Sequence, residues 1–157
     1  MAKIIKPPTP LLPRFDLSSV FLAGSIEMGT AANWQADFER EFQDIEIVLL
    51  NPRRDDWDAS WGQSAEDEQF REQVQWELKG QEQANIIAMY FDPNTKSPVT
   101  LLELGLFAQS QKLIVCCPTG YWRKGNVDLV CERYEVHQVA SLTNLIKAVK
   151  QRISRRG

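Results

Sequence analysis

Five short apolar runs alternate along this chain with segments whose apolar residues recur at helical spacing, and this alternation restricts the possible folds most strongly. The runs contain few polar residues, which is typical of strands that are covered on both faces of a parallel sheet. Helices between consecutive strands supply the crossover connections that parallel strands require. The runs are residues 19–23, 46–50, 85–91, 113–117 and 136–140; the helical segments are residues 31–42, 66–83, 126–134, 142–153 and one from Pro98 to near residues 109–111.

This pattern predicts an α/β fold with a doubly wound, five-stranded parallel sheet in the flavodoxin-like order 2-1-3-4-5 and helices on both faces. A length of 157 residues suits a single domain that spans the whole chain. Residues 1–15 contain four prolines, so we expect them to form an extended N-terminal arm on the surface rather than a regular element.

Composition excludes several classes of function. A formal net charge of −3 argues against nucleic acid and anionic membranes as partners. Three cysteines without zinc-ligand spacing and a single histidine leave little material for a metal site or a Ser-His pair, and we expect no cofactor. The N-terminus lacks the apolar core of a signal peptide, and no run is long enough to span a bilayer, so we expect a cytoplasmic protein.

Two loops of the predicted sheet contain residues that suit a ligand. Ligands of open α/β sheets bind beyond the carboxyl ends of the strands where the strand order reverses, here between the first and third strands. The first strand ends at Gly24 and Ser25, where backbone can approach a ligand closely, although this pair is equally typical of an ordinary turn. The third strand ends near Asp92, and its loop leads to Ser97, which we expect to cap the helix that begins at Pro98.

Basic and aromatic residues follow the second strand. Arg53 and Arg54 leave the same edge of the predicted sheet and could bind a phosphate or carboxylate, or pair with the acidic residues that follow them. The segment beyond them is polar and contains Trp57 and Trp61, which indicates a long surface loop that acts as a ligand lid or a subunit contact.

Two glutamates stand in apolar surroundings. Glu103 lies within the segment SPVTLLELGLFA, and Glu77 is flanked by Trp76 and Leu78 in the helix 66–83. Each could be a solvated helical side chain, and Glu77 could pair with Lys79. Alternatively, two carboxylates that face a sugar can divide the cleavage of a glycosidic bond, one as nucleophile and the other as acid or base.

Four segments, FLAGSI, NPRRDDW, FREQVQWEL and SPVTLLELGLFA, resemble in order and spacing the nucleoside 2-deoxyribosyltransferase superfamily, in particular its nucleoside 2-deoxyribosyltransferase-like subgroup. The likeness covers residues 20–108, and related deoxynucleoside 5′-monophosphate N-glycosidases share the pattern. It implies that Glu103 of the ELG motif attacks the anomeric carbon, that Glu77 assists at the base, and that Ser97 contacts the sugar. It also implies a small-molecule nucleoside or nucleotide as substrate, and a homo-oligomer.

The chain departs from the family pattern at three positions. Phe21 occupies the place of a tyrosine whose phenol helps to orient the nucleophile, so this substrate-site residue lacks the hydroxyl. Glu77 replaces the more common aspartate and reaches one methylene further, and Asn85 replaces another aspartate. The fold is unaffected by these changes, whereas the choice between sugar transfer and hydrolysis stays open.

Two functions of other classes are also compatible with the pattern. A signalling receiver would place its phosphate acceptor at Asp92. A receiver also needs acidic residues that bind magnesium at the end of the first strand, but the first acidic residue after this strand is Glu27. A flavin- or nucleotide-binding module could use residues 25–30 as a phosphate loop without catalysis. The pair of carboxylates favours the enzyme.

Overall fold

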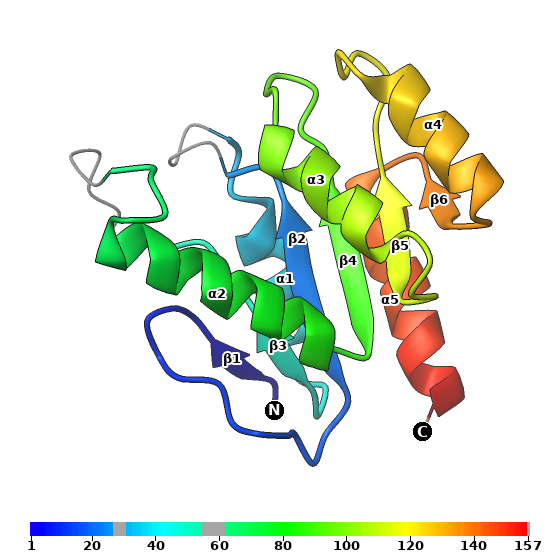
Figure 1. The fold of residues 1–157 in the computed structure, drawn as a ribbon. Coiled ribbons are helices and arrows are strands. Elements are labelled where there is room, and N and C mark those ends of the chain that lie inside the picture. The colour runs from blue at the N-terminus through cyan, green and yellow to red at the C-terminus, as the bar shows by residue number, and fades with distance from the viewer. Residues whose placement is uncertain (27–30, 55–61, 157) are drawn as a thin grey trace.

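A computed structural model describes residues 1–26, 31–54 and 62–156 of the chain. Its centre is a six-stranded sheet in the order β1-β3-β2-β4-β5-β6, in which every neighbouring pair is parallel (Figure 1). The strands are β1 (Lys3–Ile5), β2 (Ser19–Gly24), β3 (Val48–Leu50), β4 (Ile86–Tyr90), β5 (Leu113–Cys116) and β6 (His137–Val139). Strands β2 to β6 have the predicted doubly wound order.

Helices cover both faces of the sheet. Figure 1 shows α2, α3 and α4 on one face and α1 and α5 on the other. The helices are α1 (Trp34–Phe42), α2 (Glu68–Gln83), α3 (Pro98–Phe107), α4 (Lys124–Arg133) and α5 (Leu142–Arg156). Within the described residues, none of these helices is long and apolar enough to cross a membrane.

The apolar strands supply two cores because successive side chains of a strand point to opposite faces. In β4, Ile87 and Met89 pack with Leu104 of α3, whereas Ile86 and Ala88 pack with α1 and α5. This arrangement explains the nearly continuous apolar character of the strands in the sequence.

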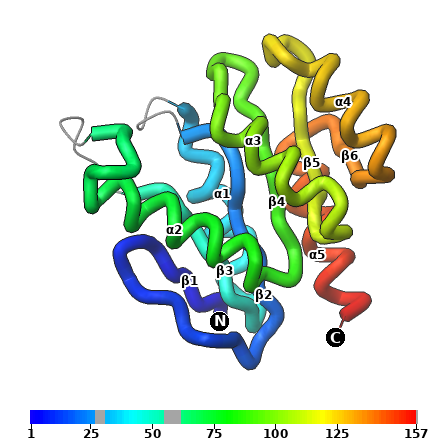
Figure 2. Tube along the Cα trace, viewed as in Figure 1, coloured from blue at the N-terminus to red at the C-terminus, as the bar shows by residue number. Residues whose placement is uncertain are grey.

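The N-terminal arm contains a strand that the sequence pattern did not predict. β1 pairs in parallel register with β3, from Lys3 opposite Val48 to Ile5 opposite Leu50. Three residues that precede the prolines suffice to cover the outer edge of β3. The rest of the arm passes beside α2, where the Trp76 indole Nε1 donates to the carbonyl oxygen of Thr9 at 2.9 Å (Figure 2). The expectation of five strands was therefore wrong by one edge strand.

The strand order reverses between β2 and β4, as expected. The two strands pair from Val20 opposite Ile86 to Gly24 opposite Tyr90. Gly24 has a φ of +149°, and a Cβ atom there would lie 2.2 Å from the Tyr90 carbonyl oxygen. Glycine is therefore required for β2 to end against β4 and for the chain to leave towards α1.

Candidate active site

Glu103 is buried on α3, with 6% of its surface exposed. One carboxylate oxygen, Oε2, accepts a hydrogen bond of 2.6 Å from Nε2 of Gln81 on α2. Burial raises the pKa of Glu103 from 4.5 to about 7, although the Gln81 hydrogen bond lowers it. The carboxyl group therefore titrates near neutral pH, as a group with a role in proton transfer or nucleophilic attack would.

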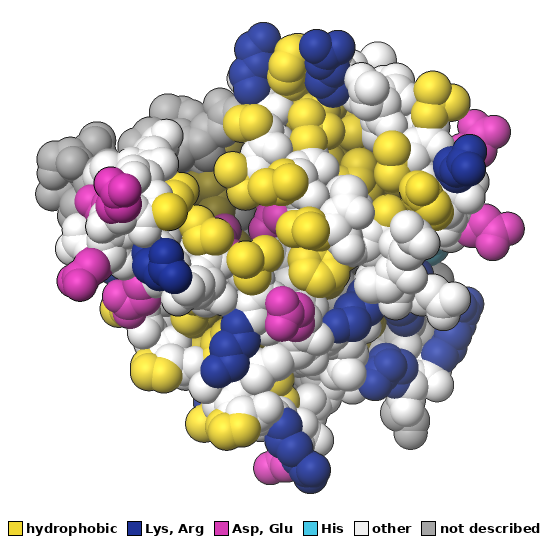
Figure 3. Space-filling model, in the orientation of Figure 1, with side chains coloured by type: hydrophobic (Ala, Val, Ile, Leu, Met, Phe, Trp, Pro, Cys, Tyr) yellow, Lys and Arg dark blue, Asp and Glu magenta, His cyan; other side chains and the backbone are white. Residues whose placement is uncertain are grey.

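Glu77 lies on α2 and interacts electrostatically with Glu103. Burial raises the pKa of Glu77 well above 4.5, the negative charge of Glu103 raises it further, and a hydrogen bond with Gln73 lowers it. Figure 3 shows acidic side chains at the surface between α2 and α3. The two predicted carboxyl groups are therefore close enough to influence each other, and the charge of Glu103 favours the protonated form of Glu77.

The inner face of α2 is more polar than the sequence pattern indicated. Phe70, Val74 and Leu78, which recur every four residues, are only partly buried. The buried residues are Gln73, Trp76, Gly80 and Gln81, of which only Trp76 has a large apolar side chain. The sequence does contain a signal for this polar stripe, because Gln73, Glu77 and Gln81 recur every four residues and so share one face of the helix.

Phe21 lies beneath α2. Its side chain is fully buried on β2, and its ring centroid is 6.0 Å from that of Trp76. A Cβ atom on Gly80 would lie 2.8 Å from the Phe21 Cε2 atom, so the helix backbone sits directly on the ring. Phe21 thus forms an apolar floor under the turn of α2 that contains Gly80 and Gln81.

A cluster of hydroxyl groups joins the ends of β2 and β4. The Oγ atoms of Ser25 and Ser97 are 2.5 Å apart, and Thr95 Oγ1 lies 3.0 Å from Ser25 Oγ and 2.7 Å from Ser97 Oγ. Ser97 has a φ of 47°, and within the described part of the chain its side chain makes no capping bond to α3. The expectation of a side-chain cap was wrong because the Ser97 hydroxyl turns towards Ser25. Thr95 was not predicted.

Asp92 fixes the two loops next to this cluster. Its Oδ2 accepts a bond from the backbone N–H of Ala32 at 3.1 Å, and its Oδ1 accepts one from the N–H of Asn94 at 2.9 Å. Its own N–H donates to Ser25 Oγ at 2.8 Å. The structure thus brings Gly24, Ser25, Asp92 and Ser97 together, and the buried Asp92 carboxylate is committed to backbone donors.

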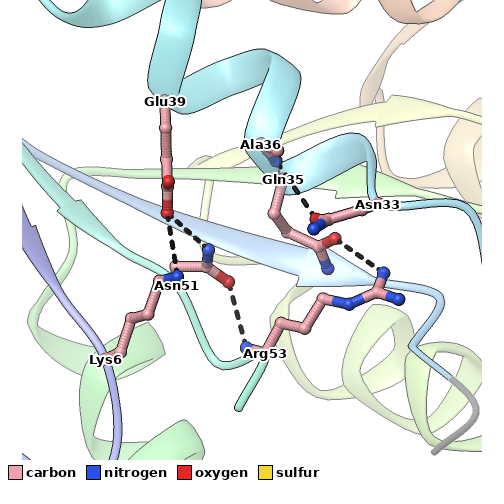
Figure 4. Close-up of polar contacts among 7 residues, drawn as sticks. All are labelled: Lys6, Asn33, Gln35, Ala36, Glu39, Asn51 and Arg53. Atoms are coloured by element: carbon pink, nitrogen blue, oxygen red, sulfur yellow. Dashed lines mark hydrogen bonds and ion pairs between the residues drawn. The ribbon is translucent and has the colours of Figure 1, made fainter. Parts of the chain in front are cut away.

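Arg53 reaches the loop before α1. Its guanidinium donates to the carbonyl oxygens of Ala31 at 2.9 Å and Ala32 at 3.1 Å. It also donates to Gln35 Oε1 at 3.4 Å (Figure 4). Arg53 therefore supports the same loop that Asp92 anchors. Arg54 is partly exposed beside it. The predicted loop function of Trp57 and Trp61 lies outside the described residues.

Residues 1–26, 31–54 and 62–156 contain no group of three His, Cys, Asp or Glu side chains that could hold a metal ion. The three cysteines are buried free thiols, and burial raises the pKa of Cys116 and of Cys131 to about 12. Among the described residues, the polar groups near the sheet's switch point are carboxyl, amide, hydroxyl and guanidinium groups.

Comparison with known proteins finds a matching family and solved structures of similar fold. The profile of the family described as nucleoside 2-deoxyribosyltransferase like matches residues 17–121, more than half of the chain. A crystal structure of a conserved protein from Enterococcus faecalis V583 superposes with a TM-score of 0.61 at 15% sequence identity, covering 87% of this chain and 99% of that chain. No curated protein matches the chain. The chain belongs to the nucleoside 2-deoxyribosyltransferase-like family.

Proposed function

We propose that the protein cleaves the N-glycosidic bond of a nucleoside or nucleotide by covalent catalysis. Glu103 attacks the anomeric carbon C1′ of the sugar, so that an ester bond forms as the bond between C1′ and the base nitrogen breaks. Glu77 gives its proton to the departing base. The ester is then resolved by a second base, which gives sugar transfer, or by water, which gives hydrolysis; Glu77 accepts the proton of either.

The coupled pair of desolvated carboxyl groups carries this proposal. The pKa of Glu103 is raised to about 7, and the pKa of Glu77 is raised by burial and by the Glu103 charge. When Glu103 ionises, its charge therefore favours the protonated form of Glu77. One group is then a nucleophile and the other an acid, which is the division of labour that cleavage of a glycosidic bond requires.

We assign the sugar to the region where β2 and β4 end. Gly24 lets backbone approach closely at this point, and the Ser25 and Ser97 hydroxyls lie beside it. Asp92 supports the site by fixing both loops rather than by contacting the substrate. Phe21 contributes the apolar floor beneath Gly80, on the turn of α2 that also contains Gln81.

Arg53 and Arg54 are our candidates for binding a 5′-phosphate. Because Arg53 already holds the carbonyl oxygens of Ala31 and Ala32, its replacement would also disturb the loop. Arg54→Met is the better test for this reason. It should weaken turnover of a nucleoside monophosphate and leave turnover of the nucleoside unchanged.

The function is tested by incubating the protein with a panel of nucleosides and their monophosphates, with and without a second base. Free base and new nucleoside are followed by chromatography. Release without an acceptor indicates hydrolysis, and exchange that requires an acceptor indicates transfer. We expect Glu103→Gln and Glu77→Gln to abolish or strongly reduce activity, whereas Glu72→Gln, at an exposed position of α2, should not.

Full activity of Glu103→Gln would refute the proposed nucleophile. Binding of a nucleotide without any turnover by the unaltered protein would instead favour a non-catalytic binding module.

We also propose that the protein forms a homo-oligomer through α3. Val99, Leu102 and Leu106 are 57%, 64% and 55% exposed, and their spacing places them on one side of the helix. Figure 3 shows hydrophobic side chains gathered over this helix. An exposed apolar stripe next to the pair of carboxyl groups suits contact with a second copy of the chain.

A further inference from the structure

We propose that Gln81 is a positioning residue for Glu103, which holds one oxygen of its carboxylate and so determines which oxygen faces the substrate. The inference rests on the proposed role of Glu103 as nucleophile. Gln81 is not among the residues that the family pattern led us to expect. Its side chain is fully buried and comes from α2, whereas Glu103 comes from α3.

Two hydrogen bonds determine the orientation of the Gln81 amide. Nε2 donates to Glu103 Oε2 at 2.6 Å and to the backbone carbonyl oxygen of Glu77 at 3.1 Å. An amide nitrogen has two N–H groups, so both are used. Rotation of the amide by a half-turn would place its oxygen against the Glu77 carbonyl oxygen and the Glu103 carboxylate, so ionised Glu103 favours the orientation described here.

The other end of the amide shows that this orientation has a cost. The buried Gln81 Oε1 has no hydrogen-bond partner among the described residues. An unpartnered buried acceptor lowers the stability of the folded state. A residue chosen for stability alone would be apolar here, so the donation from Nε2 is the feature that accounts for a glutamine at this position.

The surroundings keep Gln81 directed at Glu103. The preceding residue, Gly80, rests on the Phe21 ring, where even a Cβ atom would lie only 2.8 Å from Cε2. The helix backbone is therefore seated on the sheet at this turn. The side chain of β2 beneath this turn is Phe21, which has no hydrogen-bond donor. The hydrogen bond to Glu103 is therefore donated from α2, by Gln81.

This geometry has two consequences for Glu103. Because Oε2 is held by Gln81, Oε1 is the oxygen that is left to attack the sugar. A donor to the carboxylate also favours the ionised form and opposes the effect of burial. Loss of the donor should therefore make the nucleophile available only at higher pH.

The test compares Gln81→Met with Gln75→Met. Methionine matches the length of glutamine but donates no hydrogen bond, and Gln75 is an exposed glutamine of the same helix. The carboxyl carbons of 13C-labelled glutamate are titrated by NMR, and the Glu103 signal is identified by its loss in Glu103→Gln. We expect the pKa of Glu103 to rise by roughly one pH unit in Gln81→Met and to stay unchanged in Gln75→Met.

Activity gives a second readout. The acid limb of the pH profile of kcat/KM should move upward by the same interval in Gln81→Met, so that activity falls about tenfold below this limb and recovers above it, until Glu77 loses its proton. If Gln81→Met does not fold, the same titration and the same pH profile are measured for Gln81→Leu. An unchanged Glu103 titration in a folded variant would overturn the role of Gln81.

The titration does not depend on turnover. A shifted pKa in a protein without glycosidic activity would therefore support the role of Gln81 and refute the proposed function. An unshifted pKa in an active enzyme would support the proposed function and refute the role of Gln81.

Discussion

Glu103 and Glu77 lie in surroundings that favour their neutral forms, so their protonation states depend on a few neighbouring groups. Burial raises the pKa of both, while Gln81 and Gln73 lower them through single hydrogen bonds. The charge of Glu103 separates the two titrations further. At the scale of the residue, the proposed catalysis near neutral pH depends on this difference between two otherwise similar carboxyl groups.

We predict a bell-shaped pH dependence of kcat/KM. Activity should rise as Glu103 ionises, with its pKa near 7, and fall when Glu77 loses its proton at higher pH. Glu77→Gln should remove the falling limb, and its residual activity should be greatest on nucleosides whose base leaves readily. A falling limb that persists in Glu77→Gln would show that another group supplies the proton.

We predict that Glu103→Gln is more stable than the unaltered protein at pH 8. The pKa of Glu103 is about 7 in the fold against 4.5 for an ordinary glutamate, so its contribution to stability is lost as the pH rises from 4.5 to about 7. The loss is on the order of 3 kcal/mol. Urea unfolding at pH 5 and pH 8 measures it. A difference between the two proteins that does not grow with pH would contradict the proposed desolvation.

The sequence predicts the two glutamates but not the amide between them. Glu103 and Glu77 stand out as charges in apolar segments, whereas glutamines are common on helix surfaces. Gln81 becomes significant only because α2 packs Gly80 on Phe21 and turns the adjacent side chain inward. Ser97 likewise depends on tertiary contact, since its hydroxyl meets Ser25, which is distant in sequence.

At the scale of the element, α2 determines the site because its inner face combines a close approach to the sheet with polar side chains. Periodicity of apolar residues located the helix but misjudged its buried face, since two of the buried residues are glutamines. β1 was missed for a related reason. A strand of three residues is too short for its apolar pattern to be recognised in the sequence. It forms because its backbone pairs with the outer edge of β3.

We predict opposite effects of alanine at two helical glycines. A Cβ at Gly80 would meet the Phe21 ring at 2.8 Å, so Gly80→Ala should lower the free energy of unfolding by about 1–3 kcal/mol and reduce activity by displacing Glu77 and Gln81. A Cβ at Gly105 in α3 would meet nothing within 4 Å, so Gly105→Ala should raise the free energy of unfolding by roughly 0.5–1 kcal/mol. Thermal and urea unfolding measure both. Equal effects would refute the close packing of α2 on Phe21.

At the scale of the whole molecule, the doubly wound order explains why the site forms where it does. β2 and β4 are adjacent but separated along the chain by β3, α1 and α2, so their loops meet at the switch point with α2 and α3 on the same face. The alternation of strands and helices was enough to predict this order for the five core strands, because parallel strands need crossover helices.

We predict that Leu102→Glu dissociates the proposed oligomer. A carboxylate in the middle of the exposed α3 stripe would have to be desolvated in a subunit contact. Light scattering should show an oligomer for the unaltered protein and a smaller species for this variant. Leu17→Glu, at another exposed leucine, should not change the mass. A monomeric unaltered protein would exclude the contact.

The covalent glycosyl-enzyme tests the central claim most directly. The protein is mixed with a nucleoside or monophosphate that it cleaves, quenched in acid during turnover, and analysed by intact and peptide mass spectrometry. We predict a mass increase equal to the sugar residue, located on the peptide that contains Glu103 and absent in Glu103→Gln. Base release that continues in Glu103→Gln, or an adduct located on another residue, would contradict the account.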